Sequence, residues 1–288
     1  MLPDALSQKA RLMTLLYRVT LCVLLLILPA SQAMAQLMLY PTRIVLEGNQ
    51  RSAELELINN GTQSATYRIA LVNRRMSETG AFTETDTPLP GERFADELLR
   101  YSPRQVTLEP GVGQAIRIMV QKPADLAVGE YRSHLLFTQQ PDSQGSRSIE
   151  SRGAGAAEGI GIQLTALVGA SIPVIVRHGS TDASVSLTGL ALQRASSGAP
   201  LLGLQMQRSG TQSVYGDLTV SFTPRSGDEQ VIGRANGVAV YTPNPLRRAS
   251  IVLRPPSGLP LSNGTLRVTY REQAKDGGRL LAEAQLSL

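Results

Sequence analysis

Apolar and polar residues alternate along most of this chain, and glycine, proline, asparagine and aspartate interrupt the alternation at short intervals. A period of two residues is typical of a β-strand with one buried face, and no long stretch of helical periodicity follows the first 35 residues. The pattern therefore predicts an all-β protein. We expect strands at residues 37–46, 53–58, 65–72, 105–108, 114–120, 130–138 and 159–176, and a second series at 184–193, 201–207, 216–222, 231–241, 249–253, 265–270 and 280–286.

A polar, turn-rich segment at residues 177–183 separates the two series of predicted strands. Each series is long enough for one β-sandwich. We therefore predict two sandwich domains, at residues 36–178 and 179–288. A single large barrel is the alternative, but the break and the second full set of strands favour two domains.

One predicted strand carries a regular apolar row, with Gln163 and Thr165 on its opposite face. The segment before it, residues 141–159, is rich in glycine and serine and is long for a hairpin connection, which indicates function or mobility. The strand is either a core strand or a surface that binds a partner. The apolar residues that share its other face are Ile160, Ile162, Leu164, Ala166 and Val168.

The beginning of the chain has the pattern of a secretory signal peptide. Basic residues precede an apolar run at residues 19–28, and the small-residue site Ala33-Met34-Ala35 follows it. The run is shorter than the roughly 20 residues that a spanning helix needs, so an uncleaved anchor is the weaker alternative. We predict that residues 1–35 are a signal peptide, cleaved after Ala35, and that the protein is exported.

Composition excludes several classes of function. Cys22 is the single cysteine and lies in the predicted signal peptide, so the mature chain has no disulfide and no thiolate metal site. Two histidines, His134 and His178, are too few for a multi-histidine metal site. The net charge of +5 is mild, without a basic run, and aromatic residues are scarce, which argues against nucleic acid as a partner. No catalytic or phosphate-binding motif is present. We expect no enzymatic activity, no cofactor, no metal and no small-molecule substrate.

Three segments together carry a resemblance to a known family: residues 41–48 (Pro-Thr-Arg-Ile-Val-Leu-Glu-Gly), residues 57–61 (Leu-Ile-Asn-Asn-Gly), and Leu108-Glu109-Pro110-Gly111 followed by Gln114, Arg117 and Ile118. In this order they resemble the PapD-like periplasmic pilus (fimbrial) assembly chaperones, along most of the chain after residue 35. The resemblance implies two immunoglobulin-like sandwiches arranged in an L, and a location in the periplasm. It also implies a function: such chaperones bind and stabilise pilus subunits by donor-strand complementation and deliver them to an outer-membrane usher.

The resemblance also assigns roles to residues. The apolar row at residues 160–168 takes the place of the donor strand, whose alternate side chains enter the incomplete subunit. Arg43 takes the place of the arginine that binds the subunit's terminal carboxylate, a group that suits a guanidinium. The chain departs from the family at Pro173, where a lysine normally forms the second anchor. A different basic group is then expected to assist Arg43.

A further role concerns the junction of the two domains. Arg177 matches a family arginine that joins the domains through an ionic network, for which Glu130 and Asp276 are the matching acidic positions. Such a network fixes the angle between domains more than it adds stability, because buried ion pairs often only break even.

Two other functions remain open from the sequence. An exported immunoglobulin-like adhesion or scaffold protein would use the apolar edge for self-assembly, and a pilus subunit would be a single incomplete domain. An unpaired edge strand is itself an aggregation hazard. We therefore expect the free protein to hide this edge, either by self-association or by folding residues 141–159 over it.

Overall fold

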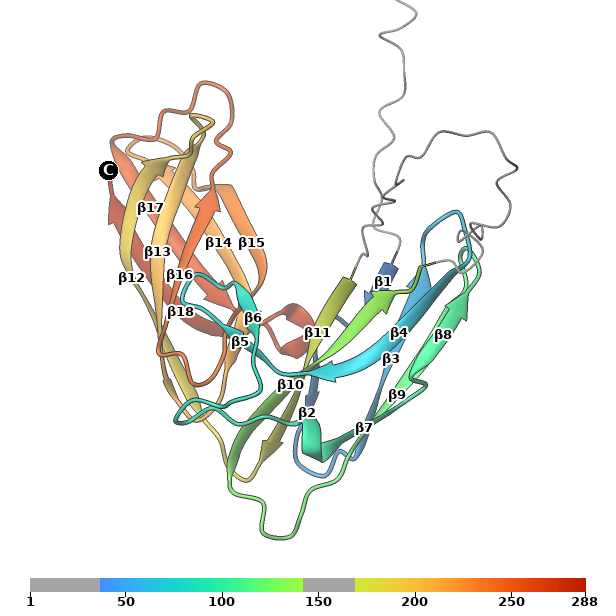
Figure 1. The fold of residues 1–288 in the computed structure, drawn as a ribbon. Coiled ribbons are helices and arrows are strands. Elements are labelled where there is room, and N and C mark those ends of the chain that lie inside the picture. The colour runs from blue at the N-terminus through green and yellow to red at the C-terminus, as the bar shows by residue number, and fades with distance from the viewer. Residues whose placement is uncertain (1–36, 142–168) are drawn as a thin grey trace, which may run out of the picture. The chain divides into compact units, whose positions relative to one another are not determined.

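The computed structural model describes residues 37–141 and 169–288, and most of these residues lie in β-strands (Figure 1). The prediction of an all-β protein is confirmed. Two predictions lie outside the described residues: the signal peptide at residues 1–35, and the donor strand formed by Ile160, Ile162, Leu164, Ala166 and Val168.

The first half of the chain forms a four-stranded and a five-stranded sheet, with the orders β1-β3-β9-β7 and β2-β11-β10-β4-β8. In the five-stranded sheet β11 is antiparallel to β10 on one side and parallel to β2 on the other. The four-stranded sheet contains β1 (Leu37–Tyr40), β3 (Ser52–Asn59), β9 (Gly113–Val120) and β7 (Leu99–Ser102). The five-stranded sheet contains β2 (Ile44–Leu46), β11 (Gly169–His178), β10 (Gly129–Gln139), β4 (Ala65–Val72) and β8 (Gln105–Leu108).

The core of this sandwich lies between the two sheets, where alternate residues of each strand meet. Leu55, Leu57 and Ile116 come from the four-stranded sheet, and Phe137 and Val174 from the five-stranded sheet; all five are fully buried. On β11 the core side chains are Ile172, Val174 and Val176. The residues between them, at odd positions, therefore point to the opposite face of the sheet.

The second half of the chain forms another pair of sheets, with the orders β12-β13-β16 and β15-β14-β17-β18. Its core is again built from alternate residues of both sheets, such as Leu202 and Met206 from one and Val220, Phe222 and Tyr270 from the other. The strands are β12 (Ala183–Arg194), β13 (Pro200–Gly210), β14 (Val214–Pro224), β15 (Gln230–Val240), β16 (Leu246–Val252), β17 (Gly264–Arg271) and β18 (Leu280–Ser287).

A small hairpin, β5 (Arg74–Met76) with β6 (Phe82–Glu84), follows β4 and contacts the second half of the chain. Met76 and Ile175 pack with Ala239 and Tyr241 in a third apolar cluster. In addition, Asn244 Nδ2 donates a hydrogen bond of 2.7 Å to the Met76 carbonyl. These contacts lie within one compact unit, Leu37–Leu288.

The described structure also contains two short 3₁₀ turns, η1 (Asp96–Leu98) and η4 (Ala274–Asp276). Within residues 37–141 and 169–288, no helix is long and apolar enough to cross a membrane. The domain boundary between residues 178 and 179, and the L arrangement, stay predictions.

Candidate functional site

The non-core face of the five-stranded sheet gathers basic side chains. On β10 the side chains of Arg132 and His134 lie on this face, because Leu135 and Phe137, at the alternate positions of the same strand, point into the core. In the register of the sheet, Arg132 pairs with Ile175 and His134 with Pro173. Arg43 immediately precedes β2, whose Ile44 pairs with Val174, so Arg43 lies beside Pro173. Arg74 of β5 reaches the same face, where its Nη1 donates a hydrogen bond to the hydroxyl of Ser171 on β11. We call Arg43, Arg74, Arg132 and His134 the arginine face.

The guanidinium of Arg43 stacks on a tyrosine ring from the second half of the chain. Its Cζ lies 4.6 Å from the centre of the Tyr215 ring, a cation–π contact. Its Nε and Nη2 atoms are buried and have no hydrogen-bond partner among the described residues. Arg43 also lines a cavity of about 400 Å³ together with Glu47, Arg177 and Tyr215.

The two unpartnered nitrogens of Arg43 form one edge of the guanidinium, and that edge matches the two oxygens of a carboxylate. The same chain shows this pairing elsewhere. Nε and Nη2 of Arg267 donate to the two carboxylate oxygens of Glu283 at 2.9 and 2.8 Å. Stacking on Tyr215 occupies the flat face of the Arg43 guanidinium, and its buried edge pairs with no acceptor among the described residues.

Arg132 and His134 are both buried and incompletely paired. Cζ of Arg132 lies 4.6 Å from the centre of the Tyr241 ring, and its Nη1 donates to the Arg74 carbonyl at 2.9 Å, whereas its Nε has no partner among the described residues. Burial lowers the pKa of Arg132. Burial, and then the charges of Arg132 and Arg74, lower the pKa of His134 from 6.5 to about 3, so this imidazole is neutral at physiological pH.

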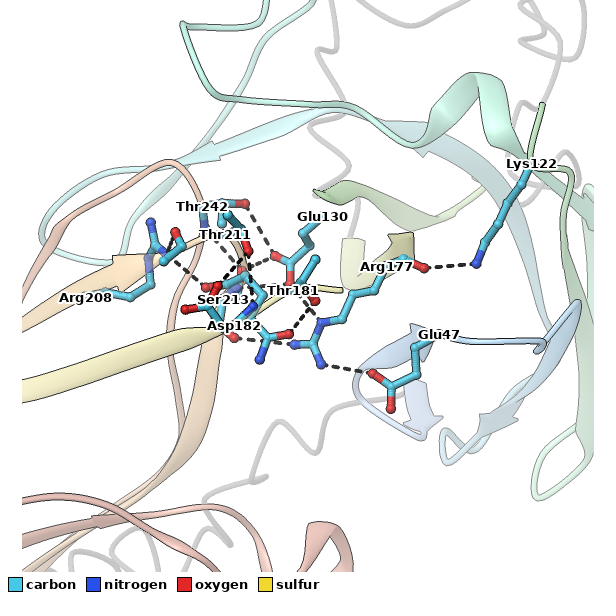
Figure 2. Close-up of polar contacts among 12 residues, drawn as sticks. Glu47, Lys122, Glu130, Arg177, Thr181, Asp182, Arg208, Thr211, Ser213 and Thr242 are labelled. Carbon is cyan, nitrogen blue, oxygen red and sulfur yellow. Dashed lines mark hydrogen bonds and ion pairs between the residues drawn. The ribbon is translucent and has the colours of Figure 1, made fainter. Parts of the chain in front are cut away.

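A network of ion pairs and hydrogen bonds joins the two halves of the chain (Figure 2). The side chain of Glu130 is fully buried, and it pairs with Nε of Arg177 at 3.1 Å. Glu130 also accepts hydrogen bonds from the backbone N–H of Ser213, at 3.0 Å, and from the Ser213 hydroxyl. Nη1 of Arg177 reaches the exposed carboxylate of Glu47 at 3.2 Å.

The structure thus brings Arg177 and Glu130 together, and the role of this pair in fixing the junction stays a prediction. It places Asp276 in the lining of the same cavity, but Asp276 forms none of the ion pairs of residues 37–141 and 169–288. Glu47, which the sequence analysis does not single out, is the second carboxylate of Arg177.

The outer edge of β11 is partly open. β2 pairs with Val174, Ile175 and Val176 only, so the stretch from Gly169 to Pro173 has no strand on that side among the described residues. Pro173 lies one residue before the paired segment, where the ladder with β2 ends, as expected for a residue without a backbone N–H. The predicted donor strand immediately precedes this open edge in the sequence.

No group of three or more metal-ligating side chains occurs in the described part of the chain. The site therefore consists of an open strand edge, an unpartnered arginine edge and a buried network. Sequence reasoning missed Glu47, Arg74, Arg132, Tyr215, Tyr241 and Ser213. A usable signal exists only for Arg132, because Glu130, Arg132 and His134 place three ionisable side chains at alternate positions of one predicted strand.

Comparison with known proteins gives matches among solved structures only: neither a family model nor a curated protein matches the sequence. One match is the complex of CsuC chaperone and CsuE tip subunit from the archaic chaperone-usher Csu pili of Acinetobacter baumannii, at 11% identity and a TM-score of 0.46, covering 86% of this chain and 98% of the other. The SafB chaperone, in complex with SafA pilin of Salmonella enterica, matches at 13% identity and a TM-score of 0.41, with 88% and 97% covered. The periplasmic chaperone SfaE matches at 12% identity and a TM-score of 0.40, with 88% and 100% covered.

The structures to which this chain is similar contain a pilus or fimbrial chaperone, in two of them bound to a subunit. Identities this low carry no information about a particular partner, so the residues described above decide which function fits.

Proposed function

We propose that this protein is a periplasmic chaperone that binds pilus subunits, stabilises them by donor-strand complementation and delivers them to an outer-membrane usher. The observation that supports this function best is the buried, unpartnered edge of Arg43 next to the open edge of β11. Leaving such a charged donor without a partner costs roughly 1–3 kcal/mol or more, so a ligand with a carboxylate is favoured there.

The open edge of β11 supports donor-strand complementation. In the sequence, Ile162, Leu164, Ala166 and Val168 fall at even positions, as do the core residues Ile172 and Val174 of β11. A strand that continued β11 would present these side chains on one face, and its backbone would pair with a subunit strand. Burying three or four such side chains gives a gross stabilisation of roughly 5–10 kcal/mol before the cost of ordering.

Arg43 and the donor strand then have separate tasks. The strand pairs through backbone hydrogen bonds that depend little on sequence, whereas Arg43 fixes where the subunit's last residue stops. A fixed end sets the register, and a shift by one residue would turn every apolar side chain of the donor strand away from the subunit.

The experiment is coexpression in the periplasm with a small pilus subunit of the same organism. The proposal predicts a soluble complex of one chaperone and one subunit, and loss of soluble subunit with either Arg43→Ala or Leu164→Asp. Arg117→Ala is the control, because Arg117 is exposed on the other sheet. Unchanged recovery of soluble subunit with both Arg43→Ala and Leu164→Asp would refute the mechanism.

A further inference from the structure

The arginine face carries more positive charge than the described acidic residues balance. Arg43, Arg74 and Arg132 take part in none of the ion pairs of residues 37–141 and 169–288. Each of the three has a buried Nε without a hydrogen-bond partner in the same residues. Several unpaired guanidinium groups on one face favour the binding of an anion.

Arg74 differs from the other two in how it is held. Its Nη1 donates a hydrogen bond of 2.7 Å to the hydroxyl of Ser171, a neutral acceptor, and its side chain is only half-buried. A carboxylate is a stronger acceptor than a hydroxyl, because charge-assisted hydrogen bonds are about twice as strong as neutral ones. The guanidinium of Arg74 is therefore able to exchange Ser171 for an anionic partner.

Arg132 is less able than Arg74 to exchange its present partners for an anion. Its guanidinium is stacked on Tyr241 and its Nη1 is bound to the Arg74 carbonyl, and only 4% of the residue is exposed. Moving Arg132 toward a ligand would break both contacts. The hydrogen bond to the Arg74 carbonyl gives Arg132 a different role, since it fixes the backbone from which the Arg74 side chain extends.

The hydrogen bond to Ser171 and the register of β2 with β11 bring Arg74 and Arg43 to the same face of β11. Ser171, which Arg74 contacts, and Pro173, beside which Arg43 lies, are on the same face of β11. Two residues on one face of a strand are about 7 Å apart, which is within the reach of two arginine side chains converging on one carboxylate. Pro173 itself brings no charge to this position.

We infer that Arg74 is the second cation of the carboxylate site and, with Arg43, binds the terminal carboxylate of the partner in place of a basic residue at position 173. This inference rests on the proposed function, because it assigns a further residue to the same site. It adds that binding draws Arg74 away from Ser171.

The neutral state of His134 fits this arrangement. His134 pairs with Pro173 across the strands, and neither ring nitrogen has a partner among the described residues. A neutral imidazole at this position adds no repulsion to the neighbouring arginines, and one of its two ring nitrogens carries an N–H donor.

The test is a nuclear magnetic resonance titration of the purified protein with N-acetylalanylalanine, with its C-terminal amide as the matched probe. In the wild-type protein the Nε–H resonances of both Arg43 and Arg74 should shift saturably with the acid and stay unchanged with the amide. Arg74→Gln should weaken binding of the acid by about tenfold, the effect of one charge-assisted hydrogen bond. Arg74→Lys should restore part of it, and Arg234→Gln, at an exposed position of the second sandwich, should have no effect.

Ser171→Ala separates binding from a structural role. If Arg74 binds the carboxylate, removing its competing hydroxyl partner should leave the affinity unchanged or higher. If the bond between Arg74 and Ser171 only supports the fold, Ser171→Ala should weaken binding as much as Arg74→Gln.

The remaining outcomes distinguish failure of this inference from failure of the proposed function. Full affinity in Arg74→Gln, with binding lost in Arg43→Ala, overturns the inference and leaves the proposed function standing. No difference between acid and amide in the wild-type protein overturns both. If Arg74→Gln fails to fold, an unshifted Arg74 Nε–H resonance in the wild-type titration is sufficient to reject the inference.

Discussion

Glu130 is the residue on which the junction between the two halves of the chain depends most. Its side chain has no exposed surface, whereas the side chain of Glu47, the other carboxylate of Arg177, is 59% exposed. Removing one member of a buried ion pair leaves the other charge uncompensated, but an exposed pair contributes little. Glu130→Ala should lower the free energy of unfolding by about 3 kcal/mol, and Glu47→Ala by less than about 1 kcal/mol. Urea denaturation of both variants checks this, and equal losses would contradict the assignment.

His134 makes the stability of the folded protein depend on pH, and the direction of this dependence follows from its pKa. The folded protein holds this pKa at about 3, below the ordinary 6.5 of the unfolded chain. The unfolded state therefore binds a proton first as the pH falls, so stability is complete above pH 6.5 and declines toward pH 3, by up to about 1.4 kcal/mol per pH unit. His134→Gln should remove this part of the decline. The test is to measure the urea denaturation midpoints of the wild-type protein and of His134→Gln between pH 7 and 4. If the midpoints of the two proteins fall in parallel as the pH is lowered, His134 does not titrate in this way.

At the residue scale the sequence predicts only part of the site. Arg43 and the pair of Arg177 and Glu130 are singled out because they match a family pattern, and their roles stay predictions. Tyr215 and Tyr241 are not singled out, because each looks like an ordinary strand tyrosine until a contact over more than a hundred residues of sequence places it under a guanidinium.

At the scale of the element, β11 should show two kinds of backbone protection. Residues 174–176 have a strand on both sides, whereas residues 169–172 pair with β10 alone. In the free protein, amide exchange should therefore be faster at 169–172. Binding a subunit at the open edge should slow the exchange at 169–172 by at least about tenfold, since each new backbone hydrogen bond must break before exchange. Equal exchange in the free protein and the complex would exclude strand pairing there.

The alternation of apolar residues predicts most of the long strands, but it does not predict where the shortest strands begin and end. Residues 37–46 read as one strand, yet they form β1 and β2 in different sheets, because Pro41 has no N–H to continue the ladder. β5 and β6 are not predicted, since three residues are too few to display a period of two, and β7 is not predicted either.

At the scale of the whole molecule, the two sandwiches should unfold together. Each has its own core, and Tyr241 belongs to the apolar cluster that joins Met76 and Ile175 to the second half of the chain. We predict one calorimetric transition for the wild-type protein and two for Tyr241→Ala, because this substitution removes both shared packing and the ring beneath Arg132. Tyr40→Ala, at a ring that is 66% exposed, should keep a single transition. A single transition for Tyr241→Ala would show that the sandwiches are coupled in another way.

The central claim is that Arg43 binds the terminal carboxylate of a pilus subunit. The most direct measurement is a double-mutant cycle: the affinity of the wild-type protein and of Arg43→Ala for one subunit with a free C-terminus and for the same subunit extended by two residues. We expect the extension to weaken binding to the wild-type protein by about tenfold or more and to have little effect on binding to Arg43→Ala. If the extension weakens binding to both proteins equally, Arg43 does not bind that carboxylate and the proposed mechanism is wrong.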